Sequence, residues 1–188
     1  MKDLLYIAPL SNRQINSSGY VNASDGMLDI YNRMSEEGLL TFDAFNLGED
    51  IYIDEKYNFG FLNINIGFLV KDETLQEKYK KISEKCDKFF ISVVFEAEPL
   101  PENWHNILKA DWISGFLCPS DYIFYLLAGY DKPCHYYPHF VNDEIFNEID
   151  ITKKKDEDFF TVLTLGQNTE RKSFKESIIA FSKALGKE

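Results

Sequence analysis

The sequence lacks the long apolar runs and the short signature motifs that identify several large classes of protein. No apolar run approaches the ~20 residues that a membrane-spanning helix needs. The GxGxxG dinucleotide fingerprint, the Walker A phosphate loop and the GxSxG nucleophile motif are all absent. These absences exclude the dehydrogenases, nucleoside triphosphatases and serine hydrolases that carry those motifs.

Cysteine is scarce. The 188 residues contain three of them: Cys86, Cys118 and Cys134. An odd number without metal-type spacing indicates neither a disulfide framework nor a zinc site. The cysteines lie in apolar runs without an adjacent base, so nucleophilic catalysis is not predicted. The first residues do not resemble a signal peptide, and we expect reduced thiols in a cytoplasmic protein.

Histidine is equally rare, and two of the three histidines lie four residues apart. Pro138 separates His135 from His139 and would break a helix there, and no third ligand is near in the sequence. No bound metal is therefore predicted.

Positive charge is in deficit. The chain has 20 Lys and Arg against 31 Asp and Glu, a formal net charge of −11, and the acidic residues are spread along its length. We therefore expect no general attraction to nucleic acid or to an anionic membrane. With 45% hydrophobic and 15% aromatic residues, the chain is expected to fold into a globular protein.

Apolar runs alternate with helical patterns, which predicts an α/β fold. The runs are too continuous for a sheet that is wet on one face and suit parallel strands covered by helices on both faces. The predicted strands are residues 4–10, 39–45, 59–66, 89–95, 112–117 and 133–137. A helix with an apolar face follows the loop 11–19, and this strand, loop and helix are how a Rossmann-like domain begins.

Helix-start patterns occur at two further places. Thr74 and Glu77 form a capping-box pattern, and Ser120 follows a proline at the start of an apolar helical segment. We predict helices at both positions.

A charged segment at residues 151–158 has the composition of a linker. We therefore predict a Rossmann-like domain over residues 1–152. Residues 153–188 would hold the linker, a strand at 159–165 and a helix with Phe174, Ile178, Phe181 and Leu185 on one face. One strand and one helix cannot cover each other's apolar faces. Either the chain is the amino-terminal part of a longer protein, or this unit adds one more βα step to the first domain.

The order of several short features resembles a known family. The features are Glu96, Pro101 and Trp104, then Ala110 and Asp111, Pro119 and Ser120, Gly129, Lys132 and Pro133, and finally Pro138, His139 and Phe146. This order is similar to the end of the amino-terminal domain in glycosyltransferases of the GT-B fold, especially the large retaining family (glycosyl transferases group 1) that includes sucrose and glycogen synthases. The similarity continues at residues 161–166 and 171–181, which resemble the first strand and helix of that family's second domain.

The resemblance implies an enzyme that moves a sugar from a nucleotide-sugar donor to an acceptor hydroxyl, with retention of anomeric configuration and without a bound metal or other cofactor. The acceptor could be a glycan, a lipid, a protein or a modified base. The chain would supply the acceptor-side domain and the beginning of the donor-side domain, and it would be inactive alone. Two alternatives stay open: a noncatalytic binding or assembly module with the same half-fold, and an unrelated flavodoxin-like domain.

The resemblance also implies two catalytic candidates. Glu96 occupies the loop where the family places a group near the donor sugar, and His139 follows the last strand of the first domain. Glu98, two residues after Glu96, is an acceptor-side candidate. Phe140 stands where the family often has glycine, which would narrow the cleft. A loop carboxylate that caps the next helix is the alternative interpretation of Glu96.

Gly19 lies just before a predicted helix, where backbone N–H groups can face an anion. It is a donor-binding candidate, and its neighbours Ser18 and Tyr20 are acceptor-side candidates. An ordinary flexible loop is the alternative.

Lys172 matches the family lysine that contacts the donor phosphates, and Arg171 adjoins it. Gln167 stands where the family often has an arginine, which shifts the expected positive charge to this pair. A solvated surface pair is the alternative.

Overall fold

The computed structural model describes residues 1–11, 19–95, 99–139 and 173–186. The chain divides into two compact units, Met1–Asn147 and Glu148–Glu188, and each is described by itself. The domain boundary and the linker predicted near residue 152 lie outside the described residues. No helix within the described ranges has the length and apolar character to cross a bilayer.

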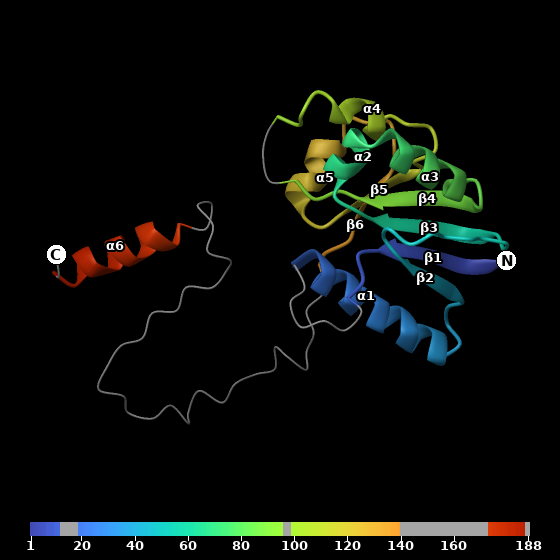
Figure 1. Cartoon of the computed structure of the whole chain (residues 1–188), viewed down its shortest axis with the longest axis horizontal. Coiled ribbons are helices and arrows are strands. Elements are labelled where there is room, and N and C mark those ends of the chain that lie inside the picture. The colour runs from blue at the N-terminus through green and yellow to red at the C-terminus, as the bar shows by residue number, and fades with distance from the viewer. Residues whose placement is uncertain (12–18, 96–98, 140–172, 187–188) are drawn as a thin grey trace. The chain divides into compact units, whose positions relative to one another are not determined.

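A six-stranded parallel sheet forms the centre of the first unit (Figure 1). Its spatial order is β2-β1-β3-β4-β5-β6. The strands are β1 (Lys2–Ala8), β2 (Phe42–Asn46), β3 (Tyr57–Asn63), β4 (Cys86–Ser92), β5 (Gly115–Cys118) and β6 (Cys134–Tyr136). The predicted α/β fold with a Rossmann-like parallel sheet is confirmed, with strand ends that differ by up to a few residues from those expected.

Helices cover both faces of this sheet. They are α1 (Gly19–Glu36), α2 (Ile66–Lys71), α3 (Glu73–Ser83), α4 (Trp104–Leu108) and α5 (Asp121–Leu127). Helix α1 lies on one face, and α2 to α5 lie on the other (Figure 1). Each face has its own core, because alternate strand residues point to opposite sides. Tyr6 and Phe61 pack with Tyr31 of α1, whereas Leu5 and Leu62 belong to the larger core under α2 to α5.

The third strand is shorter than predicted. The expected strand 59–66 ends at Asn63, and helix α2, which was not predicted, begins at Ile66. The side chain of Asn65 accepts a hydrogen bond from the backbone N–H of Gly67 (2.9 Å) and caps this helix. Ile66 and Leu69 are buried three residues apart, so the apolar run continues as one turn of helix instead of as strand.

The predicted capping box at Thr74 and Glu77 was wrong by two residues. Asp72 is the cap of α3, and its carboxylate accepts a hydrogen bond from the backbone N–H of Leu75 (3.0 Å). The helix start predicted at Ser120 is confirmed, and the serine hydroxyl caps the helix by accepting from the N–H of Ile123 (3.4 Å). Aspartate is a strong cap, and here it takes the role that the sequence pattern assigned to threonine.

Tyr79 of α3 is fully buried, and within the described residues its hydroxyl has no hydrogen-bond partner. We predict that Tyr79→Phe raises the free energy of unfolding by about 1 kcal/mol, because it removes an unsatisfied buried hydroxyl. Burial raises the pKa of Tyr79 to about 12, above the value near 10 in an unfolded chain. The free energy of unfolding of the protein with Tyr79 therefore falls as the pH rises from about 10 toward 12. The stability advantage of the Tyr79→Phe variant should grow over this pH range. Urea unfolding at pH 7 and pH 10.5 tests both statements, and a destabilised variant at pH 7 would contradict the first.

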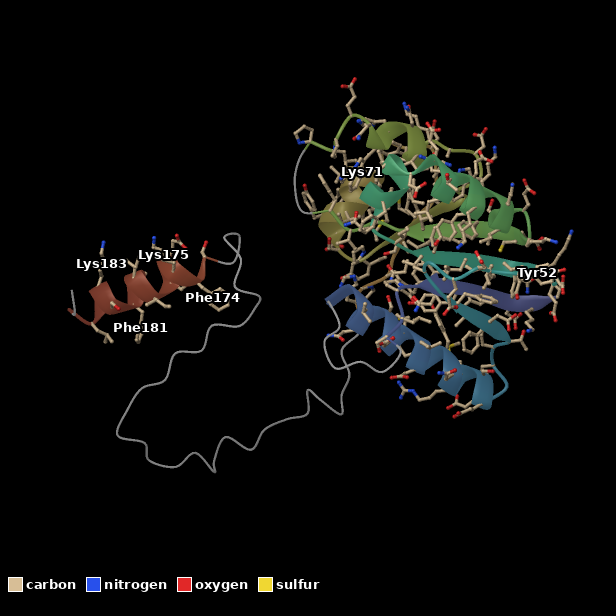
Figure 2. All side chains as sticks on the ribbon, viewed as in Figure 1. Tyr52, Lys71, Phe174, Lys175, Phe181 and Lys183 are labelled. Carbon is tan, nitrogen blue, oxygen red and sulfur yellow. The ribbon has the colours of Figure 1, made fainter. Side chains whose placement is uncertain are left out.

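The second unit contains helix α6 (Phe174–Ala184), which confirms the predicted helix. Phe174 and Phe181 project from one side of it, and Lys175 and Lys183 from the other (Figure 2). None of its described residues is buried. The strand predicted at residues 159–165 lies outside the described residues.

Candidate functional site

The connections of the sheet create a crevice between β1 and β3. The chain leaves β1 through α1 to reach β2 on one side, and it leaves β3 through α2 and α3 to reach β4 on the other. Adjacent parallel strands whose connections run in opposite directions form a topological switch point, and ligands of open α/β sheets bind outside the carboxyl ends of the strands there. The carboxyl ends of β1 and β3 are therefore the first place to look for a site.

A small crevice lies beside this place, at the carboxyl ends of β3 and β4 on the face covered by α1. Its lining comes from α1, the ends of β3 and β4, and the segment after β6: Ala23, Met27, Phe61, Asn63, Ser92, Tyr137, Pro138 and His139. Its free volume is about 10 Å³. That is about the space of one water molecule. A ligand larger than water would therefore lie over its mouth, where His139 is exposed, because Asn63 and Ser92 are buried.

Buried polar groups lie along the inner side of the crevice. The amide nitrogen of Asn63 donates to the hydroxyl of Ser24 (2.8 Å), and the hydroxyl of Tyr6 donates to the carbonyl of Ser24 (3.2 Å). Ser92, at the end of β4, is also buried. Because buried polar groups must be paired, these bonds hold α1 against β1 and β3 at the carboxyl edge.

The chain is also tied down where it leaves β1. Leu10 exchanges two hydrogen bonds with the side chain of Asn46, each 3.2 Å long. The backbone N–H of Ser11 donates to Asp25 of α1 (3.0 Å), and the serine hydroxyl bonds the same carboxylate. The first described residues of the loop are thus fixed against β2 and α1.

His139 reaches the crevice because the segment after β6 crosses the sheet toward α1. β6 is an edge strand, yet the hydroxyl groups of Tyr137 and Tyr31 of α1 are hydrogen-bonded (2.6 Å). The ring of Tyr137 also packs edge-on against Phe61 of β3, with ring centroids 5.3 Å apart. Burial raises the pKa of both tyrosines, so both hydroxyls stay neutral at physiological pH. This anchor brings Pro138 and His139 to the carboxyl end of β3.

We expect Tyr137→Phe to lower the free energy of unfolding by about 1–2 kcal/mol, because the buried hydroxyl of Tyr31 loses its partner. Tyr31→Phe should have a similar effect. The double variant should lose less than the sum of the two, since no hydroxyl is then left unpaired. Urea unfolding of the three variants measures the coupling, and strictly additive losses would show that the hydroxyl pair contributes nothing.

Three of the predicted site residues lie at this edge. Gly19 is the first residue of α1, one helical turn before Ala23 of the lining, and Tyr20 follows it in the helix backbone. His139 lines the crevice and is exposed. The structure therefore places Gly19 and His139 at the same end of the sheet. The other predicted site residues lie outside the described residues: Ser18, Glu96, Glu98, Arg171 and Lys172.

Three lining residues were not singled out from the sequence: Asn63, Ser92 and Tyr137. Asn63 was assigned to the interior of a longer strand, so its position at a strand end was missed. The signal was present in part, because Asn63 is the first polar residue after the apolar run Phe59–Leu62. Nothing local marks Tyr137, because its contacts with Tyr31 and Phe61 are 106 and 76 residues distant in sequence.

The cysteines do not provide a nucleophile in this region. Burial raises the pKa of Cys86 and of Cys118 to about 12, so both thiols stay protonated at physiological pH. In the parts of the chain that the structure describes, no three His, Cys, Asp or Glu side chains converge as a metal would require. His135 packs against Phe90, with ring centroids 5.6 Å apart, and does not line the crevice.

The described geometry is therefore a narrow crevice with a mixed polar and apolar lining at the carboxyl ends of β3 and β4, with one exposed imidazole at its edge. Compared with protein-family profiles and with curated proteins, the chain matches none.

Proposed function

We propose that this chain is the acceptor-side half of a GT-B type glycosyltransferase, which transfers a sugar from a nucleotide sugar to an acceptor hydroxyl. The observation that carries the proposal is the crevice at the carboxyl ends of β3 and β4, beside the switch point, with Asn63, Ser92 and His139 in its lining. The order of short features that resembles this family supports it independently. Together they favour a ligand at the carboxyl edge over a ligand elsewhere on the sheet.

The side chains at the crevice suit a neutral, hydroxyl-rich ligand. An amide, a hydroxyl and an imidazole both donate and accept hydrogen bonds, as sugar hydroxyls do. None of the described lining residues carries a permanent charge. A nucleoside diphosphate needs positive charge or helix N-termini, so the donor would be held mainly by a second domain, in which Arg171 and Lys172 are the donor-binding candidates. The acceptor sugar or alcohol would lie on this side.

The proposal is tested with a saccharide panel and a nucleotide-sugar panel. We expect saturation-transfer NMR to detect weak binding of at least one saccharide to the 188-residue chain. The product of the complete reading frame, incubated with the donor panel, should add one glycosyl residue to that acceptor, as read by mass spectrometry. Saccharide binding without transfer by any donor would favour the noncatalytic binding module. Absence of both binding and transfer would overturn the proposal.

A further inference from the structure

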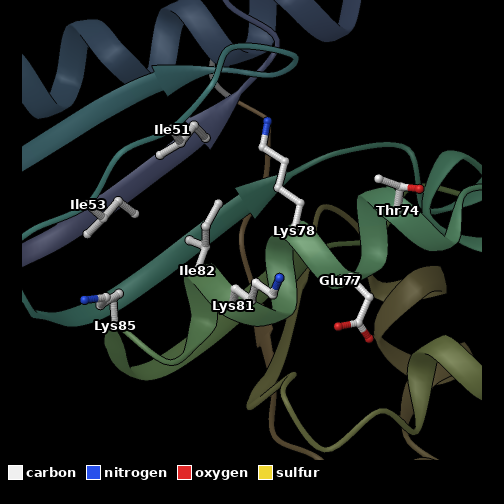
Figure 3. A pocket seen from close by; sticks show the side chains of 8 residues that line it. All are labelled: Ile51, Ile53, Thr74, Glu77, Lys78, Lys81, Ile82 and Lys85. Carbon is white, nitrogen blue, oxygen red and sulfur yellow. The ribbon is translucent and has the colours of Figure 1, made fainter.

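A second and larger hollow lies on the opposite face of the sheet, between α3 and residues 49–56, the segment that joins β2 to β3 (Figure 3). It is lined by Ile51, Ile53, Thr74, Glu77, Lys78, Lys81, Ile82 and Lys85. Its volume is about 440 Å³. That volume is in the range of small-molecule pockets. None of these residues lines the crevice, so the hollow, called here the lysine groove, is a separate feature of the first unit.

One side of the lysine groove is apolar. Ile51 and Ile53 come from the extended connection, and Ile82 faces them from α3 (Figure 3). Successive residues of an extended chain point to opposite sides. Tyr52, between the two isoleucines, is accordingly 82% exposed and points away. The groove therefore offers the half-buried side chains of Ile51 and Ile53 to a ligand, and the edge of Ile82, which is 8% exposed, forms its floor.

The other side is positively charged. Lys78 and Lys81 lie one turn apart on α3, and Lys85 lies in the turn that follows the helix. At 1.5 Å of rise per residue, the three lysines span about 10 Å. Lys78 donates to the carbonyl of Glu49 across the groove (2.5 Å). Lys81 and Lys85 are exposed, and the ammonium group of neither has an ion pair or a hydrogen bond with any described residue.

The carboxylates nearby do not neutralise these lysines. Glu77 is the single acidic residue of the lining, and it is 3.7 Å from Lys80, which lies outside the lining. On the connection, Glu49 accepts from the backbone N–H of Asn46 (3.4 Å) and Glu55 lies 3.9 Å from Lys2. Neither of these two acids lines the groove. The lining thus holds three lysines and one glutamate beside an apolar surface, and Asp50, Asp54 and Glu84 of the flanking segments lie outside it.

We propose that the lysine groove binds a small amphipathic organic anion. An aryl or short acyl body would lie on Ile51, Ile53 and Ile82, and a carboxylate, sulfonate or phosphate would pair with Lys81 and Lys85. Burial of the apolar body supplies affinity, and the ammonium groups select the charge. Neither half of the groove suffices alone, because exposed lysines bind a free anion weakly and an open apolar surface discriminates poorly.

The test uses the whole chain and three probes. 8-Anilinonaphthalene-1-sulfonate carries both an apolar body and an anion, N-phenyl-1-naphthylamine is its neutral counterpart, and inorganic phosphate is the anion alone. We expect the sulfonate to bind the native protein at one site and the other two probes to bind far more weakly. Lys81→Gln with Lys85→Gln should weaken sulfonate binding by about tenfold, since two charge pairs near the surface are lost.

A matched control separates the site from the general charge of the protein. Lys71→Gln with Lys88→Gln removes the same two charges from exposed lysines outside the groove, and it should leave the affinity nearly unchanged (Lys71 is labelled in Figure 2). Ile53→Gln, which removes part of the apolar side, should also weaken binding. The proposal would be overturned if the two lysine double variants lost the same sulfonate affinity, or if the neutral probe bound as tightly as the sulfonate. It would also be overturned if the groove variants bound the sulfonate as tightly as the unaltered protein. Thermal unfolding followed by circular dichroism confirms that each variant is folded during the titration.

Discussion

Replacing Gly60 by alanine is expected to lower the free energy of unfolding by about 3 kcal/mol. Gly60 is a buried residue of β3, on the face covered by α2 to α5. A Cβ atom at this position would lie 2.7 Å from the sulfur of Cys86 and 2.8 Å from Cε2 of Phe89, with Cδ2 of the same ring closer still. The ring of Phe89 is 1% exposed and is enclosed by the core, so it cannot move aside without displacing its neighbours. The glycine is therefore required for the close packing of β3 and β4.

Gly129 provides the control for this prediction. A Cβ atom at Gly129 would have no neighbour within 4 Å, and its backbone does not lie in the left-handed region. Gly129→Ala should therefore be neutral, or stabilising by about 0.5 kcal/mol through a less flexible unfolded chain. Urea unfolding followed by circular dichroism measures both variants. If Gly60→Ala changed the free energy of unfolding as little as Gly129→Ala, the side chains under α3 would have to rearrange to admit the added methyl group, contrary to the prediction.

The second large effect is expected at the crevice and depends on the proposed function. His139→Ala should reduce sugar transfer by about tenfold to a hundredfold, the loss of one or two hydrogen bonds to the substrate in the transition state. The free energy of unfolding should hardly change, because His139 is exposed. Initial rates at saturating and at limiting acceptor concentration show whether the loss lies in turnover or in binding.

His135 offers a matched control for this experiment. It lies four residues earlier, is also exposed, and packs beside Phe90 instead of at the crevice. His135→Ala should leave transfer unchanged. If both histidine variants were fully active, the crevice would have no part in the reaction, although the fold described above would stand. A loss confined to His135→Ala would move the site from the crevice to the edge strand β6.

Local features of the sequence were sufficient for most of the fold. The apolar strands at β1, β4 and β5, the helical face of α1 and the cap at Ser120 follow from side-chain periodicity and capping chemistry within a few residues. Where the prediction failed, two local solutions competed. Residues 64–66 continue the apolar run and were assigned to the strand, but Asn65 caps a helix that begins at Ile66. Asp72 and Thr74 could both cap α3, and aspartate does so.

The sequence by itself determined that this chain builds a parallel sheet covered by helices, because alternation and period are properties of neighbouring residues. Only the tertiary structure decided that Tyr137 crosses from the edge strand to Tyr31 and Phe61, which carries His139 to the carboxyl end of β3. It also decided that Ile51 and Ile53 face the lysines of α3 across a groove. The physical reason is that these contacts depend on strand order and on the paths of the connections. Both are set by packing between segments far apart in the chain.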